Sequence, residues 1–170
     1  MKDNASELLP LVDEEGQVVG KATRGECHSG SMLLHPVVHL HVFDPQGRLY
    51  VQHRPAWKDI QPDKWDTAVG GHIDWGENVE QALQREAREE LGLTDYTPEF
   101  LCRYINQSDR ERELVNVFRT TTEAVPTPSE ELDGGQFLTR EEILERIQAG
   151  NFFTPNFCSE WLRVFGNDAD

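Results

Sequence analysis

Residues Gly71 to Leu93 read GHIDWGENVEQALQREAREELGL, a glycine-bounded loop followed by a long acidic segment. Asn78 is a helix-capping residue type, and Gln81 stands three residues after it, as in a capping box. Gly92 suits the left-handed conformation in which many helices end. The stretch therefore predicts a helix over residues 78–91.

An apolar stripe follows one side of this predicted helix at every fourth residue: Val79, Leu83, Ala87 and Leu91. On a helical wheel, Glu86 and Glu90 lie on or beside the edge of the stripe, and Glu89 lies a little further round. Carboxylates gathered in this way repel one another unless a cation offsets their charge, and oxygen ligands suit Mg²⁺. Taken alone, the segment could equally be a solvated acidic helix with Arg85 and Arg88 as salt-bridge partners.

The full spacing of the segment is more specific than its charge. It reads glycine, five residues, glutamate, seven residues, Arg-Glu, two residues, Glu-Glu, one residue and Gly-Leu. Across residues 71–93 this pattern resembles the Nudix box, and Ala87 is its one soft position, because Ile, Leu or Val is usual there. The resemblance implies the Nudix fold, an α/β/α sandwich of the α+β class with a mixed central sheet flanked by helices.

The same resemblance implies which residues carry an activity. Glu86, Glu89 and Glu90 match the metal ligands and catalytic carboxylates of the family, with Mg²⁺ or Mn²⁺ as the cofactor. Bound divalent cations neutralise a diphosphate and lower the pKa of a bound water. The family cleaves diphosphate linkages in nucleoside diphosphate derivatives and related diphosphates. Four further positions match residues that hold the loop and the helix in place: Gly71, Glu77, Arg85 and Gly92.

The flanks of the box resemble a narrower branch. VGKATRGECH (residues 19–28) and Leu34-His35 resemble type I isopentenyl-diphosphate isomerase, and the likeness runs from about Leu11 to Phe157. This second resemblance implies another metal site of three histidines and two glutamates, a donor set that suits Zn²⁺, Mn²⁺ or Mg²⁺. The matching positions are His28, His35, His72, Glu111 and Glu113. The residues that match its diphosphate-binding cations are Arg24, Arg54 and Lys58.

Two positions depart from the isomerase. Gly70 stands where the isomerase has a cysteine, so the chain has no thiol there to move a proton at carbon. Asn156 stands where a tryptophan would face a carbocation. The intact box and the missing cysteine favour a metal-dependent hydrolase of the isomerase-like branch. An isomerase-like enzyme and a non-catalytic Nudix sensor remain the alternatives, although a sensor tolerates the loss of Glu89 or Glu90 and this chain keeps both.

The rest of the chain alternates short strands with a few helices, which suggests a layered α+β domain over residues 1–170. Residues 8–12 and 17–21 are predicted to pair as a small N-terminal hairpin, because turn-forming residues lie between them. Further strands are predicted at 36–43, 49–53, 64–69, 97–105, 113–121 and 135–138. Helices are predicted at 139–149 and 156–165, with a helical turn at 23–28.

Composition excludes several classes of protein. The 170 residues carry a net charge of −15, so a general basic surface for duplex nucleic acid is absent, although a local basic pocket for a phosphorylated small molecule is compatible with it. No apolar run is long enough to cross a bilayer. Three scattered cysteines without a CxxC motif favour a reducing compartment, which predicts a cytoplasmic protein. The oligomeric state, monomer or homodimer, is left open.

Overall fold

The computed structural model describes residues 6–55, 63–124, 126 and 134–166. Its centre is a seven-stranded mixed sheet in which the strands β5, β4, β3, β8 and β7 follow one another, while β6 pairs with β3 and β9 pairs with β4. These strands are β3 (Leu34–Phe43), β4 (Leu49–His53), β5 (Trp65–Thr67), β6 (Val69–His72), β7 (Glu99–Gln107), β8 (Arg112–Thr121) and β9 (Gly135–Leu138). Only β3 and β8 run parallel among the paired strands.

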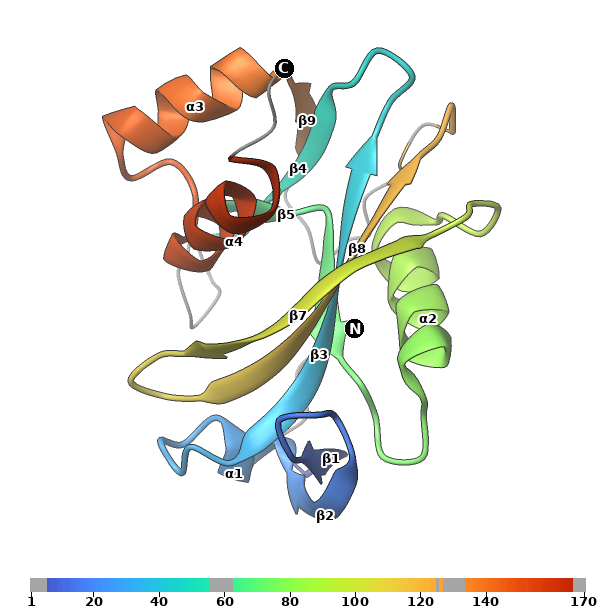
Figure 1. Ribbon diagram of the computed structural model, residues 1–170, viewed down its shortest axis with the longest axis vertical. Helices are drawn as coiled ribbons and strands as arrows, with labels where there is room; N and C mark the ends of the chain where they lie inside the picture. Colours follow the sequence, from blue (N-terminus) through green and yellow to red (C-terminus); the bar gives the residue numbers. More distant parts are fainter. Residues whose placement is uncertain (1–5, 56–62, 125, 127–133, 167–170) are drawn as a thin grey trace.

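Helices cover both faces of the sheet (Figure 1). Helix α2 (Val79–Leu91) packs its apolar stripe on Val38 and Leu40 of β3. On the other face lie α3 (Arg140–Ala149) and α4 (Pro155–Phe165), whose side chains form a second core with β4 and β9. This arrangement confirms the predicted sandwich with a mixed central sheet.

A separate antiparallel hairpin, β1 (Leu8–Val12) and β2 (Val18–Thr23), lies beside one end of β3, as predicted (Figure 1). One turn of helix, α1 (Arg24–Cys27), follows β2 and is capped by Thr23. The hairpin has its own small core around Leu9 and Cys27. The segment from Thr23 to Leu34 therefore connects the hairpin to the start of β3.

The predicted strand over 64–69 is wrong in its extent. The structure has two strands here, β5 and β6, divided at Ala68, and β6 continues through Gly70-Gly71 to His72. The reason is tertiary, because the backbone of the two glycines pairs with Val38 and His39 of β3. The box therefore begins inside a strand of the central sheet.

Strand β3 carries histidines on the face covered by α4. Side chains alternate along a strand, so His39 and His41 point away from the α2 face that Val38 and Leu40 occupy. Both histidines are buried: the whole-residue exposed fraction is 8% for His39 and 0% for His41. Both contact Glu160 of α4. A buried charged network therefore joins the sheet to the last helix.

A candidate metal and diphosphate site

Helix α2 begins and ends as its sequence predicts. The Asn78 side chain accepts the backbone N–H of Gln81, and the Gln81 side chain accepts the backbone N–H of Asn78. Gly92 closes the helix in the left-handed conformation, with φ of 65°. These contacts satisfy backbone groups at both helix ends and set the rotation at which Glu86 and Glu90 meet the sheet.

Arg85 joins α2 to the loop that precedes it. Its Nε and Nη2 donate to the two oxygens of Glu77 at 2.7 and 2.9 Å, and Nη2 also donates to the carbonyl oxygen of His72 at 3.0 Å. The bidentate bond with Glu77 raises the pKa of Arg85, so the guanidinium stays charged. Loop and helix therefore form one rigid unit.

Glu86 lies against the backbone of Gly71. A Cβ atom at position 71 would overlap the Glu86 carboxylate, so glycine is required for this approach. Glu90 points to the same place, where it accepts a hydrogen bond from the Gln52 amide at 3.2 Å. The two carboxyl groups are in contact with each other.

Burial and the repulsion between like charges both disfavour the ionised form of these two carboxyl groups. Burial raises the pKa of Glu86 to about 7, with Arg85 opposing the shift and Glu89 adding to it. Burial and the neighbouring Glu86 raise the pKa of Glu90 well above its ordinary value. A divalent cation would offset the repulsion, and carboxylate oxygens are the ligands that Mg²⁺ prefers. The donor set therefore fits the metal that the box implies.

Glu89 is placed differently from its two neighbours. It lies on the exposed side of α2, with 35% of its side chain exposed, and its Oε1 lies 3.4 Å from Nη1 of Arg85. The structure therefore brings Glu86 and Glu90 together and leaves Glu89 on the solvent-exposed edge of this carboxylate pair. From there its carboxylate could contact an ion or a water bound to the pair.

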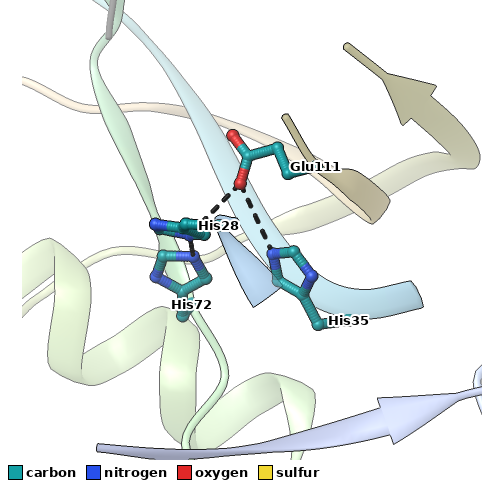
Figure 2. Close-up of side chains that lie close together, drawn as sticks. All are labelled: His28, His35, His72 and Glu111. Carbon is teal, nitrogen blue, oxygen red and sulfur yellow. Dashed lines mark hydrogen bonds and ion pairs between the residues drawn. The ribbon is translucent and has the colours of Figure 1, made fainter. Parts of the chain in front are cut away.

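A second cluster gathers residues from four parts of the chain (Figure 2). His28 ends α1, His35 lies on β3, His72 ends β6, and Glu111 precedes β8. One ligand atom from each of these four lies within 4.8 Å of the others. Glu113 is next to them, because the parallel register pairs it with His35, and its Oε2 lies 4.0 Å from His35 Nε2.

The contacts inside this cluster favour a cation at its centre. Nε2 of His28 and Nε2 of His72 are 3.0 Å apart. Oε1 of Glu111 lies 3.1 Å from Nε2 of His28 and 3.7 Å from the buried Nε2 of His35, and the second distance is too long for a hydrogen bond. Imidazole nitrogens and a carboxylate oxygen that converge at these distances suit a bound divalent metal ion. The residues therefore fit the second metal that the resemblance implies.

Protonation differs among the members of the cluster. Burial, Arg24 and the other histidines hold the pKa of His72 well below its usual value, so its ring is neutral and can act as a ligand. Burial alone would lower the pKa of His35, but the Cys27 thiol and the neighbouring glutamates raise it to about 10. A cation bound among these donors would displace that proton.

The three basic residues predicted to bind a diphosphate lie in different parts of the protein. Arg24 lies beside the histidine cluster, where its charge acts on His72 and its Nη1 lies 3.4 Å from Glu7. Arg54 follows β4, and its Nη1 lies 3.7 Å from Asp66. Lys58 lies outside the described residues. The structure thus places Arg24 at the cluster and Arg54 at the end of β4.

The two departures from the isomerase also have a definite place. Gly70 is exposed on β6, and a Cβ atom there would meet the ring of His39 at 3.4 Å. Asn156 lies in the first turn of α4, and its Oδ1 is 3.0 Å from the Tyr104 hydroxyl. Cys27 is fully buried against His35 and all three cysteines are free thiols.

Sequence reasoning missed two residues of this region. Gln52 donates to Glu90 and to the carbonyl oxygen of Thr67, and no local motif marks it. Glu160 is fully buried under the histidines of β3. Its signal was present in the sequence as a lone carboxylate on the apolar stripe of Phe157, Trp161 and Phe165, opposite two alternating histidines.

Known proteins agree with this architecture. The NUDIX domain model matches residues 33–156. An uncharacterized Nudix hydrolase of Streptomyces coelicolor is 33% identical over 167 residues, covering 96% of this chain and 91% of that protein. An isopentenyl-diphosphate Delta-isomerase of Kocuria rhizophila is 35% identical over 170 residues, covering 95% and 92%.

Among solved structures, the crystal structure of DR0079 from Deinococcus radiodurans superposes with a TM-score of 0.81 at 29% identity, covering 94% of this chain and 99% of that one. Within the described residues, no helix has the length and apolar character needed to span a membrane. The family match covers the sheet, the box and α3, and with the similarity of these relatives it shows that the chain belongs to the Nudix family.

Proposed function

We propose that the protein is a divalent-metal-dependent hydrolase that cleaves a diphosphate linkage in a nucleoside diphosphate derivative or a related organic diphosphate. The observation that supports this most is the contact of Glu86 with both Gly71 and Glu90 at the start of an intact box. Nη1 of Arg85 lies 3.6 Å from Oε1 of Glu86, but two buried carboxyl groups in contact still cost stability unless they bind a cation. A divalent cation with a phosphorylated substrate is the ligand that suits it.

The residues of the site would have different roles in that reaction. Glu86 and Glu90 would hold Mg²⁺ or Mn²⁺, and Glu89, from the exposed edge of the pair, would complete the set or orient the attacking water. When bound, the metal neutralises the diphosphate and lowers the pKa of water. Arg85 and Glu77 keep the loop fixed, and Gln52 orients the Glu90 carboxylate. Arg24, Arg54 and Lys58 would bind the phosphates by charge-assisted hydrogen bonds.

We also propose that His28, His35, His72, Glu111 and Glu113 bind a second divalent ion. The convergence of ligand atoms from His28, His35, His72 and Glu111 within 4.8 Å of one another supports this site. Zn²⁺, Mn²⁺ and Mg²⁺ are all compatible with mixed imidazole and carboxylate ligands. Because this site is near Arg24, an ion bound there would help to hold the phosphorylated end of the substrate.

The test of the hydrolase is a screen for released phosphate over nucleoside diphosphate derivatives, dinucleoside polyphosphates and isoprenoid diphosphates. Turnover should require Mg²⁺ or Mn²⁺ and stop with EDTA. Glu90→Gln should reduce kcat roughly 100-fold or more, since it removes a ligand and even outer partners of a metal contribute about 10- to 100-fold. Glu89→Gln should reduce it as well. The matched control is Glu80→Gln, an exposed acid of the same helix.

Activity that survives EDTA, or that is equal in wild type, Glu89→Gln and Glu90→Gln, would contradict the metal assignment. Tight binding of a substrate without any turnover would favour the non-catalytic sensor instead.

A second candidate function is isomerisation of isoprenoid diphosphates. It is favoured by the convergence of His28, His35, His72 and Glu111, with Glu113 beside them, at positions that match the isomerase. The similarity to the Kocuria rhizophila enzyme also favours it. It is opposed by Gly70, because glycine cannot act as a general acid or base. We expect no interconversion of isopentenyl and dimethylallyl diphosphate when either is incubated with the protein and Mg²⁺. Formation of the isomer would contradict the proposed hydrolase and support this second function.

A further inference from the structure

A buried polar network lies outside the Nudix box, between the sheet and α4. Glu160 is fully buried, and its carboxylate accepts three hydrogen bonds, from His39 Nδ1 at 2.7 Å, from His41 Nε2 at 2.6 Å and from the Tyr104 hydroxyl at 2.6 Å. A buried carboxylate is costly unless it is fully satisfied in this manner. Glu160 is therefore an anchor for three side chains that the apolar core alone would not fix.

The two histidines of this network differ in what they face. His41 has no exposed side-chain surface and packs edge-on against Phe165. His39 has 11% of its side chain exposed, and its ring lies against Gly70, whose missing Cβ would be 3.6 Å from His39 Nε2. Among the described residues, no group forms a hydrogen bond with that Nε2. His39 thus presents one ring nitrogen to the exposed backbone of Gly70.

Gly70 lies between the two candidate metal clusters. Its neighbour Gly71 faces Glu86 on one side of β6, and its own N–H contacts Glu90. Two residues further along β6, on the same face as Gly70, His72 belongs to the histidine cluster. A diphosphate that reached both clusters would pass over Gly70 and therefore over Nε2 of His39.

We propose that His39 is a substrate-contacting residue whose Nε2 donates a hydrogen bond to a non-bridging oxygen of the substrate's phosphate chain, and that Glu160 is the positioning residue that holds its ring. The proposal rests on the proposed function, because it takes the diphosphate to lie between the two clusters. It assigns a role to residues outside the box and outside the five-residue cluster.

The hydrogen bonds decide which ring nitrogen is available. An ionised carboxylate only accepts, so His39 donates from Nδ1 and keeps Nε2 for the substrate. Burial alone would lower the pKa of His39, but Glu160 of α4, Glu113 of β8 and Asp66 of β5 raise it to about 9. The ring is then an imidazolium at neutral pH, and Nε2 carries a proton suited to a charge-assisted bond with phosphate.

The test measures binding rather than turnover, with methylenediphosphonate as a non-hydrolysable diphosphate in the presence of Mg²⁺. Calorimetry should show that His39→Phe weakens its Kd by roughly 10- to 100-fold, the range for a hydrogen bond to a charged group. His39→Gln, which places an amide N–H near the position of Nε2, should recover most of the affinity. Thr120→Val, a buried polar change on β8 whose partner is the Thr97 carbonyl, is the control and should bind as wild type does.

A second measurement needs no variant with a changed ring. In the wild-type protein, ¹⁵N NMR should show the Nε2 resonance of His39 shifting on addition of methylenediphosphonate, while His41 stays unchanged. Glu160→Gln should lower the pKa of His39 and weaken the binding of methylenediphosphonate, with the fold retained by circular dichroism.

The outcomes separate this inference from the proposed function. Equal Kd values for wild type and a folded His39→Phe, or an unmoved Nε2 resonance on saturation, overturn the role of His39. Loss of binding in Glu90→Gln together with equal affinity in His39→Phe overturns this inference alone. Binding through His39 without any metal-dependent turnover supports the inference and overturns only the hydrolase.

Discussion

At the scale of single residues, the absence of a side chain is as consequential as its presence. Gly71 has no Cβ, and that space is occupied by the carboxylate of Glu86. The atom in the way is the far end of a flexible side chain, so a methyl group at position 71 would turn Glu86 aside and leave the backbone of β6 in place. Position 71 therefore controls the carboxylate pair more than it controls the fold.

Gly71→Ala should accordingly separate stability from metal binding. We expect its Tm to stay within a few degrees of wild type, while its Mn²⁺ affinity falls by roughly 10-fold or more, as for other changes that misorient a ligand. Thermal melting and Mn²⁺ titration measure the two effects. Gly20→Ala is the control, because a Cβ there meets only Leu11 at 3.8 Å. Unchanged Mn²⁺ affinity in Gly71→Ala would place the ion away from Glu86.

The contact of His39 with Glu160 makes a prediction about pH. The pKa of His39 is raised, so its contribution to stability is complete below the unfolded value of about 6.5 and is lost as the pH rises through about 9. The pKa of Glu160 is held well below its usual range, chiefly by His39 once burial is overcome, so its contribution is lost only as the pH falls below about 4.5.

Urea unfolding of wild type and His39→Gln tests this. The difference in unfolding free energy should be largest near pH 6 and should narrow by more than about 1 kcal/mol by pH 9, since each pKa unit corresponds to about 1.4 kcal/mol. In Thr120→Val, used again as the control, the difference from wild type should not vary with pH. A constant difference for His39→Gln would mean that the ring does not titrate in this range.

At the scale of elements, stabilising contacts at both ends of α2 compensate for the repulsion between carboxylates in its middle. The capping box at Asn78, the left-handed Gly92 and the Arg85–Glu77 bond stabilise the helix. The contact between Glu86 and Glu90 destabilises it. The helix is therefore a rigid support whose local stability offsets the carboxylate pair.

Asn78→Ala should lower the unfolding free energy by about 1 kcal/mol, because the first-turn N–H groups of α2 lose their acceptor. Asn78→Asp keeps an acceptor oxygen and should lose little. Denaturant midpoints at saturating Mg²⁺ and without it check the effect. We expect the loss to be the same in both, and a loss confined to one condition would mean that Asn78 acts through the metal site.

At the scale of the whole molecule, the histidine cluster brings together side chains from parts of the chain that are far apart in sequence. His28 belongs to the segment after the N-terminal hairpin, His72 to β6 and Glu111 to the connection between β7 and β8 (Figure 2). An ion held by all of them would cross-link the hairpin to the sheet. Any ligand that binds only the folded state raises its stability by mass action.

Metal binding at this cluster should therefore appear as thermal stabilisation. At an ion concentration about 100 times the Kd the gain is about 2.7 kcal/mol, or roughly 5–10 °C in Tm for a chain of this size. The comparison is made in Glu90→Gln, so that the box contributes little. Adding His28→Gln should abolish the shift, whereas adding His53→Gln, a histidine outside the cluster, should not. An equal shift in both would locate the ion elsewhere.

Local patterns in the sequence were enough for most of the elements and for the family. The boundaries of α2, both of its caps and the N-terminal hairpin follow from residues within a few positions of one another. The spacing of the box likewise lies within 23 consecutive residues, and it is recognisable without any knowledge of packing. The five candidate ligands of the second cluster were identified by position, through resemblance.

Tertiary structure alone decided how those residues meet. Glu86 reaches Gly71 only because β6 pairs with β3 and α2 packs across them, which also extended β6 beyond the predicted strand. His39 and Glu160 are 121 residues apart, and no periodicity within either segment refers to the other. Helical and strand patterns report the neighbours of a residue along the chain, whereas contacts of this kind depend on strand register and on which helix covers which face of the sheet.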